Sequence, residues 1–218
     1  LRGALCRRAA APAAASLECA AANVGAAARA LSPPELARVV RQLNRARVVY
    51  VMGFGQCAHL AGALAAHLQP FCAHVLDVAA QGGSEVAAGQ LAHIGGRDVL
   101  FAIALPRYSL DALRLAHYAR ERGACVIALT DSPASPLAGL GDLVLYAEGS
   151  HPVLPSSACA ALALIEALAV ALMASDKNNV AKAACLGEAV ATYLYGATPA
   201  SGGARALPKR GAASGKTP

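Results

Sequence analysis

The sequence predicts an α/β protein of the flavodoxin-like class, a three-layer α/β/α sandwich around a five-stranded parallel sheet with strand order 2-1-3-4-5. From residue 47 onward, short apolar runs alternate with helical segments, which is typical of parallel sheets. The runs are apolar at consecutive positions, so each strand is expected to be buried on both faces and to need helices on both sides. With 218 residues, 56% of them hydrophobic, the chain is long enough for one such domain.

The individual elements follow from local patterns. Two linker helices are expected within residues 17–46, separated at Ser32, Pro33 and Pro34, because Ser32 stands at the N-cap spacing from Glu35. The expected strands are residues 48–52, 72–76, 99–104, 125–129 and 143–146. The expected helices after the linker are residues 56–69, 84–92, 109–122, 156–174 and 179–194.

The two ends of the chain differ from its body. Residues 1–16 and 196–218 are expected to be disordered, since the second stretch combines Gly, Pro, Ser and basic residues with little to bury. The formal net charge is +6, but seven of the 19 basic residues lie outside residues 17–195. The body therefore carries 12 basic and 13 acidic residues. This distribution favours a solvated basic tail over a nucleic-acid-binding arm.

Cysteine and histidine usage indicates a reduced protein without a metal site. Seven cysteines stand singly, with no CxxC pair, and the six histidines are dispersed. This pattern is typical of buried, reduced thiols in a cytoplasmic protein. The apolar stretch 157–174 contains Glu166 and is mostly alanine. We therefore expect it to be a buried core helix, and no membrane partner is expected.

In a sheet with this strand order, ligands bind beyond the carboxyl ends of strands 1 and 3. The first strand is followed by Gly53-Phe54-Gly55-Gln56-Cys57-Ala58. Two glycines allow a ligand to approach the backbone, and the N–H groups of the helix start attract an anion. The stretch also fits a GxGxxA dinucleotide motif, with Asp77 as the ribose-binding acid. On its own it leaves a dinucleotide site, a phosphosugar site and a simple tight turn open.

The third strand is followed by Leu105-Pro106-Arg107-Tyr108-Ser109. Ser109 is a natural N-cap at a positive helix end, and Arg107 offers a planar fork of donors to a phosphate. A capping serine and an exposed arginine also occur without any ligand, so this simpler interpretation stays open.

Other polar residues are candidates for the same pocket. Glu85 could act as the base of an aldose–ketose isomerase or lie on the surface. Glu166 is expected to be buried in its helix and to need a partner, either in the site or at a dimer interface. Ser156 and Ser157 either cap that helix or contact a ligand. The remaining candidate pocket residues are His59, Asp131 and His151.

Three stretches resemble the SIS (sugar isomerase) domain, and specifically the C-terminal effector domain of RpiR/MurR-type bacterial transcriptional regulators. They read ARVVYVMGFGQC, RDVLFAIALPRYSLDALRLAHYARERGACVIALTDSPASPLAGLGDLVL and SSACAALALIEALAVALMA. The resemblance extends over residues 17–194. It implies a phosphosugar-binding domain at residues 47–195 that senses a phosphorylated sugar or sugar acid without a cofactor. It also implies a homodimer or tetramer.

Members of this family reach DNA through an N-terminal helix-turn-helix domain. Residues 1–16 leave no room for one, so we expect it to be truncated or lost. The alternatives are a sugar-phosphate isomerase on the same fold and, on the strength of GxGxxA and Asp77, a nicotinamide-dependent oxidoreductase.

The resemblance also implies where a ligand is contacted, although several positions depart from the family pattern. Gln56 and Cys57 stand where the family usually carries serines, and Arg107 stands where it carries glycine. Arg107 is therefore expected to supply charge that hydroxyl and backbone groups supply in other members. No catalytic residue is assigned, and Cys57 lacks an identifiable His or Asp partner for nucleophilic chemistry. The expected ligand-binding residues are Gly53, Gly55, Gln56, Cys57, Arg107, Tyr108, Ser109, Ser156 and Ser157.

Overall fold

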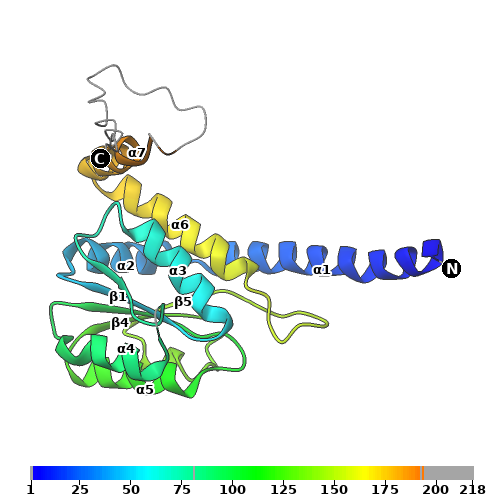
Figure 1. Cartoon of the computed structure of the whole chain (residues 1–218), viewed down its shortest axis with the longest axis horizontal. Helices are drawn as coiled ribbons and strands as arrows, with labels where there is room; N and C mark the ends of the chain where they lie inside the picture. Colours follow the sequence, from blue (N-terminus) through cyan, green and yellow to red (C-terminus); the bar gives the residue numbers. More distant parts are fainter. Residues whose placement is uncertain (1, 81, 192, 194–218) are drawn as a thin grey trace, which may run out of the picture.

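The computed structural model describes residues 2–80, 82–191 and 193, with side chains from residue 11 onward. Five parallel strands form one sheet in the order β2-β1-β3-β4-β5, with helices on both faces (Figure 1). This confirms the predicted flavodoxin-like fold. The strands are β1 (Val49–Gly53), β2 (Val75–Asp77), β3 (Val99–Ile103), β4 (Cys125–Thr130) and β5 (Leu143–Tyr146). The boundaries differ from the predicted ones by up to three residues.

The helices lie close to their predicted positions. They are α1 (Arg2–Ala30), α2 (Pro33–Arg45), α3 (Gln56–Leu68), α4 (Ser84–Gln90), α5 (Leu110–Glu121), α6 (Cys159–Ser175) and α7 (Lys177–Ala191). Two 3₁₀ turns, Leu91–His93 and Ala138–Leu140, complete the set.

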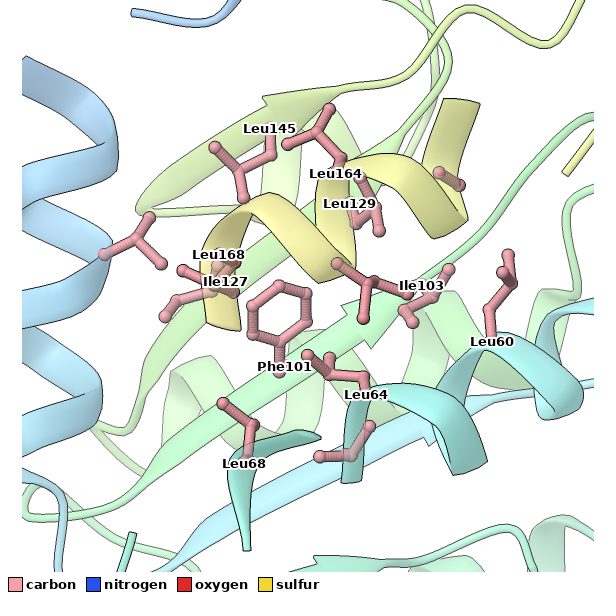
Figure 2. Packing of buried hydrophobic residues seen from close by; sticks show 14 of the residues in the cluster. Leu60, Leu64, Leu68, Phe101, Ile103, Ile127, Leu129, Leu145, Leu164 and Leu168 are labelled. Carbon is pink, nitrogen blue, oxygen red and sulfur yellow. The ribbon is translucent and has the colours of Figure 1, made fainter. Parts of the chain in front are cut away.

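The sheet separates two apolar layers. On one face, α1, α2, α3 and α6 pack against the inward-facing residues of the strands, and on the other face α4 and α5 do so (Figure 1). Side chains alternate along each strand, so Phe101 and Ile103 point to the first layer while Leu100 and Ala102 point to the second. In Figure 2, Phe101 lies between the leucines of α3 and those of α6. The two layers fix the helices that begin at the carboxyl edge of the sheet.

The connection between α1 and α2 is capped as predicted. The Ser32 hydroxyl accepts a hydrogen bond from the Glu35 N–H at 3.4 Å, and prolines occupy the first turn of α2. The Glu35 carboxylate accepts from the Val144 N–H at 3.1 Å. This bond joins the linker helix to β5.

The N-terminal expectation was wrong for residues 2–16, which belong to one 29-residue helix rather than to a disordered segment. Alanine has the highest helix propensity of all residues and is the commonest residue in this stretch. In Figure 1 the first half of α1 extends beyond the body of the domain. The predicted basic tail, residues 196–218, lies outside the described residues, and the other domain boundaries stay predictions.

Two further expectations concern membranes and thiols. No single helix among the described residues is long and apolar enough to cross a membrane; α6 and α7 pass that test only as a pair, by length and composition, and are bent by 116°. The six cysteines whose side chains are described are all free thiols. Cys57 is buried as expected, but Cys159 and Cys185 are exposed, because both stand on helix faces that no other element covers.

One ion pair with a buried carboxylate and a half-exposed guanidinium joins the starts of β1 and β3. The Arg47 guanidinium donates two hydrogen bonds to Asp98, from Nε to Oδ1 at 2.8 Å and from Nη2 to Oδ2 at 2.6 Å. The Gly95 N–H also donates to Asp98 Oδ2, at 2.9 Å. Asp98 is only 2% exposed, whereas Arg47 remains partly in solvent. The hydrogen bond and charge of Arg47 hold the pKa of Asp98 below its usual range.

We expect Asp98→Asn to lower the free energy of unfolding by about 2 kcal/mol at pH 7, because one half of a buried, bidentate pair loses its charge. The pKa of Asp98 is lowered by folding, so its contribution is complete above the unfolded-state pKa of about 3.9 and is lost as the pH falls through the folded-state value. Urea unfolding between pH 7 and pH 3 should therefore show the two proteins converging in acid. The exposed Glu121→Gln serves as the matched control; a difference that stays constant with pH would contradict the assignment.

Candidate functional site

The candidate site lies where the strand order reverses, between β1 and β3. These strands are neighbours, and Gly53 at the end of β1 is in register with Ile103 at the end of β3. Because α3 and α5 follow these two strands and pack on opposite faces of the sheet, the two connecting loops face each other. The starts of both helices therefore border the same space.

A cavity of about 440 Å³ occupies this space. Both predicted loops contribute to its lining, together with one residue that precedes α6. We refer to it below as the first cavity. Its lining residues are Phe54, Gly55, Gln56, Cys57, Ile103, Ala104, Leu105, Pro106, Arg107, Ser109 and Ser156.

The first loop needs both of its glycines. A Cβ atom on Gly53 would lie 2.3 Å from the Cys57 carbonyl oxygen, so only glycine permits the close approach of β1 and the first turn of α3. Gly55 is the N-cap of α3 with φ of 58°, a left-handed conformation that glycine adopts at little cost. No side chain caps this helix start. The Cys57 and Ala58 N–H groups donate to the Phe54 and Gly55 carbonyls, both at 3.1 Å, which leaves the Gln56 N–H as the donor that an anion in the first cavity can reach.

The second loop presents the positive charge of the first cavity. Arg107 has φ of 72°, the only positive φ at a non-glycine residue in the described part of the chain. Ser109 is the N-cap of α5, and its hydroxyl accepts from the Ala112 N–H at 3.4 Å. Arg107 and the positive end of α5 thus both border the first cavity from the second loop.

Hydrogen bonds to the end of β4 fix the shape of this loop. The Thr130 hydroxyl donates to the Ala104 carbonyl at 2.7 Å, and the Tyr108 hydroxyl donates to Asp131 Oδ1 at 2.8 Å. Tyr108 was expected to contact a ligand. It does not line the first cavity, because its ring packs with the apolar layer of α4 and α5 and its hydroxyl is bonded to Asp131.

Ser156 provides a buried hydroxyl without a partner. The residue is 2% exposed, and its Oγ forms no hydrogen bond with any described residue. Burying an unpaired hydroxyl costs about 1–3 kcal/mol, so Ser156 is a candidate for contact with a ligand in the first cavity. Ser157 does not line the cavity; its hydroxyl accepts from the Cys159 N–H at 3.4 Å, which explains why α6 begins three residues later than predicted.

Several other candidates lie away from the first cavity. His59, Glu85 and Glu166 are exposed and do not line it. The expectation that Glu166 is buried was wrong: α6 turns Leu164, Ile165 and Leu168 to the core and leaves Glu166 in solvent, so it needs no partner.

Asp77 and Asp131 also lie outside the first cavity. Asp77 Oδ1 accepts from the Ala79 N–H at 3.2 Å, within its own turn. Because Asp77 does not line the first cavity, the structure gives no support to Asp77 as the ribose-binding acid of a dinucleotide site there. Asp131 is half-buried behind the second loop and lines a neighbouring cavity instead.

His151 belongs to a contact with α1 rather than to the first cavity. Its Nε2 lies 2.7 Å from the Ser16 hydroxyl, and its Nδ1 accepts from the N–H groups of Val153 and Leu154 at 3.1 and 2.8 Å. Two apolar residues that line the first cavity, Ile103 and Leu105, were not among the expected ligand-binding residues, although Leu105 lies in the predicted second loop. Ile103 was predicted as part of a buried strand, and nothing in an apolar run marks which of its members border a cavity.

The chemistry of the lining is that of binding an anion. Burial raises the pKa of the Cys57 thiol, so it is a poor nucleophile at neutral pH. Among the described residues, no group of three or more His, Cys, Asp or Glu side chains is placed to hold a metal ion. The polar groups that remain are Arg107, Ser109, Ser156, Gln56 and the two helix starts. Together these features define a doubly wound α/β domain with a cavity at its switch point whose lining suits an anion.

Comparison with known proteins identifies the family. The SIS domain model matches residues 42–171, and the chain belongs to the SIS domain family. An RpiR transcription factor from Sphaerobacter thermophilus (sugar isomerase domain) is similar in structure, with 26% identity, a TM-score of 0.72, and coverage of 81% of this chain and 96% of that one.

Two further structures share the fold. The NanR protein of Vibrio vulnificus, complexed with ManNAc-6P, has 22% identity, a TM-score of 0.74, and coverage of 84% of this chain and 70% of that one. A putative sugar-phosphate isomerase from Listeria monocytogenes has 20% identity, a TM-score of 0.63, and coverage of 78% and 91%. No curated protein matches the sequence.

The left-handed backbone conformation of Arg107 leads to a prediction about the stability of two variants. A side chain in this conformation costs about 1 kcal/mol relative to glycine, and glycine is the residue that the family resemblance places here. We expect Arg107→Gly to be more stable than Arg107→Ala by about 1 kcal/mol in urea unfolding, although both remove the same charge. Equal stability of the two variants would contradict the strained conformation.

Proposed function

We propose that this chain is the effector-sensing domain of an RpiR-type transcriptional regulator of carbohydrate metabolism, and that it binds a phosphorylated sugar or sugar acid in the first cavity. The observation that carries the proposal is the convergence of two helix starts, the Arg107 guanidinium and the buried, unpaired Ser156 hydroxyl on one cavity.

The phosphate would bind between the two helix starts. Backbone N–H groups at a helix N-terminus and the helix dipole both favour an anion there. Arg107 adds charge-assisted hydrogen bonds in a planar fork. The Ser156 hydroxyl is available to a sugar hydroxyl, and the apolar floor of Ile103 and Leu105 suits the C–H face of a sugar ring.

The similar structures support a phosphosugar as the ligand. The NanR protein was solved with ManNAc-6P, and the structure from Sphaerobacter thermophilus is described as an RpiR transcription factor. Sugar-phosphate isomerases share the same fold. The residues that line the first cavity therefore have to distinguish a sensor of phosphosugars from a sugar-phosphate isomerase.

The lining favours binding over isomerisation. Aldose–ketose isomerisation needs a general base within hydrogen-bond reach of the substrate. In the described part of the chain, no carboxylate and no imidazole lines the first cavity. Glu85, the candidate base, is exposed on α4.

The segment between β5 and α6 connects the first cavity to α1, and through it a bound ligand would affect the rest of a regulator. This segment carries Ser156 in the cavity wall and Ser150 at its other end. The Asn23 amide, on α1, donates to the Ser150 carbonyl at 2.7 Å. A ligand that binds Ser156 would thus bias the position of α1, the helix that extends beyond the domain.

We also propose a homodimer or tetramer located in the cytoplasm. Association through α6 and α7 is supported by exposed apolar side chains on both helices, namely Val170, Met173, Val180 and Val190. The free thiols support a reducing compartment. Contact with DNA would require a helix-turn-helix domain joined to α1.

The binding proposal predicts a thermal shift with phosphorylated sugars. A panel of hexose, hexosamine and sugar-acid phosphates, including ManNAc-6P, is compared with the same compounds without phosphate. A compound at ~100 times its Kd stabilises the fold by about 2.7 kcal/mol. We expect a shift with at least one phosphorylated compound and none with its dephosphorylated form. A shift that does not depend on phosphate, or turnover of the bound compound, would contradict the proposal.

Two variants locate the binding. Arg107→Ala should weaken binding of the phosphorylated compound about 10- to 100-fold, since a charge-assisted bond is removed. Ser156→Ala should weaken it about fivefold without lowering the stability of the unliganded protein, because the deleted hydroxyl has no partner to lose. The control is Arg114→Ala, an exposed arginine on α5 outside the first cavity. The Kd of the phosphorylated compound is measured by calorimetry for each of the three variants. If Arg107→Ala and Arg114→Ala change this Kd equally, the compound binds outside the first cavity.

A further inference from the structure

An apolar groove lies between α2 and α6, which are neighbours in the helical layer on one face of the sheet (Figure 1). We call it the α2 groove. Its volume is about 340 Å³, and its lining residues differ from those of the first cavity. Its apolar lining consists of Pro33, Leu36, Ala37 and Val40 from α2 and Ala171 from α6.

Hydrogen bonds hold the two walls of the α2 groove together. Asn44 Nδ2, on α2, donates to the Ser175 hydroxyl at the end of α6, at 3.0 Å. This hydroxyl donates in turn to the Leu172 carbonyl at 2.7 Å, and Ser175 itself lines the groove. The groove is therefore formed before anything binds in it, which lowers the entropic cost of binding.

A row of arginines runs along the α2 groove. Arg38, Arg41 and Arg45 are spaced three and four residues apart, so they lie on one face of α2. All three are exposed, none forms an ion pair within the described residues, and Arg41 also lines the groove. The carboxylate of α2, Glu35, accepts from the Val144 N–H instead. The guanidinium groups are consequently free to pair with carboxylates of a partner.

These features together indicate which kind of partner fits. Protein interfaces combine an apolar centre with a polar rim in which arginine is enriched, and arginine forms two parallel hydrogen bonds with a carboxylate. Nucleic acid would use the arginines but would leave the apolar groove unfilled. A second copy of the chain does not supply an acidic helix, because no described helix carries more than two carboxylates.

We propose that the α2 groove docks an acidic amphipathic helix of another protein. Apolar side chains of this helix, three and four residues apart, lie in the groove between α2 and α6. Its carboxylates pair with the arginine row. The groove lies outside the first cavity, so this inference goes beyond the proposed function and does not depend on it.

A peptide-display selection on the full chain tests the proposal. The library contains random peptides of about 14 residues, which span nearly four helical turns. We expect the enriched sequences to combine apolar residues three and four positions apart with an excess of Asp and Glu over Lys and Arg. The Kd of the enriched peptides is then measured by fluorescence anisotropy, and added salt should raise it.

Two variants separate the contribution of the groove from that of its charge. Arg41→Gln combined with Arg45→Gln should raise the Kd about tenfold, because charge-assisted hydrogen bonds are lost. Ala37→Arg should also raise the Kd about tenfold although it adds a positive charge, because the longer side chain fills the groove. The matched control is Arg97→Gln combined with Arg114→Gln, at two exposed arginines outside the groove, and it should leave the Kd unchanged.

Several results would overturn the proposal. One is a selection that enriches no peptide, or only peptides without an acidic excess. Another is equal binding of the peptides to Ala37→Arg and to the natural chain, which would show that they bind outside the groove. Tighter binding of a DNA duplex by Ala37→Arg than by the natural chain, without peptide binding, would assign the arginines to nucleic acid.

The remaining alternative is that a second copy covers the α2 groove. Sedimentation velocity of the natural chain and of Ala37→Arg tests it, and we expect the same oligomeric state for both. If Ala37→Arg breaks an oligomer into monomers, the groove is an interface between copies and the proposal fails. Neither this result nor those of the selection affects the binding of a phosphosugar in the first cavity.

Discussion

The feature on which the site depends is the adjacency of two parallel strands whose following helices leave to opposite faces of the sheet. Strand β1 leads into α3 on one face, and its neighbour β3 leads into α5 on the other. Each helix presents unpaired N–H groups at its start. The topology brings these two starts to one edge of the sheet, so the backbone alone favours an anion there, as the proposed function requires. Side chains then decide which anion fits.

Two features at this edge of the sheet lower the stability of the fold. Arg107 occupies a left-handed conformation, and the Ser156 hydroxyl is buried without a partner. Each costs about 1 kcal/mol or more in the unliganded protein. The surrounding structure sustains both, through the Thr130 and Tyr108 hydrogen bonds to the second loop and the Ser157–Gly149 bond beside Ser156. Strain and unpaired polar groups that are fixed in this way are typical of binding sites, where a ligand repays them.

The alternation of apolar runs and helices was sufficient to predict the strand order and therefore the two loops, Gly53–Cys57 and Leu105–Ser109. The spacing of the glycines predicted that Gly55 stands at the start of a helix, and the preference for serine at N-caps predicted the same for Ser109. Helix faces were harder, because Glu166 stands in an apolar run whose core-facing side is set by tertiary packing with α3 and the sheet. The same applies to Tyr108, which sequence alone cannot orient between a ligand and the Asp131 carboxylate. The disorder predicted for residues 1–16 was wrong at residues 2–16, whose alanines favour a helix that continues into the packed part of α1.

The most direct test of the central claim is a crystal structure of the chain with the phosphorylated sugar that stabilises it most in the thermal-shift panel. We predict that the phosphate contacts the Arg107 guanidinium and the N–H groups at the starts of α3 and α5, with a sugar hydroxyl at Ser156. A phosphate bound at any other surface, with the first cavity free of it, would contradict the account.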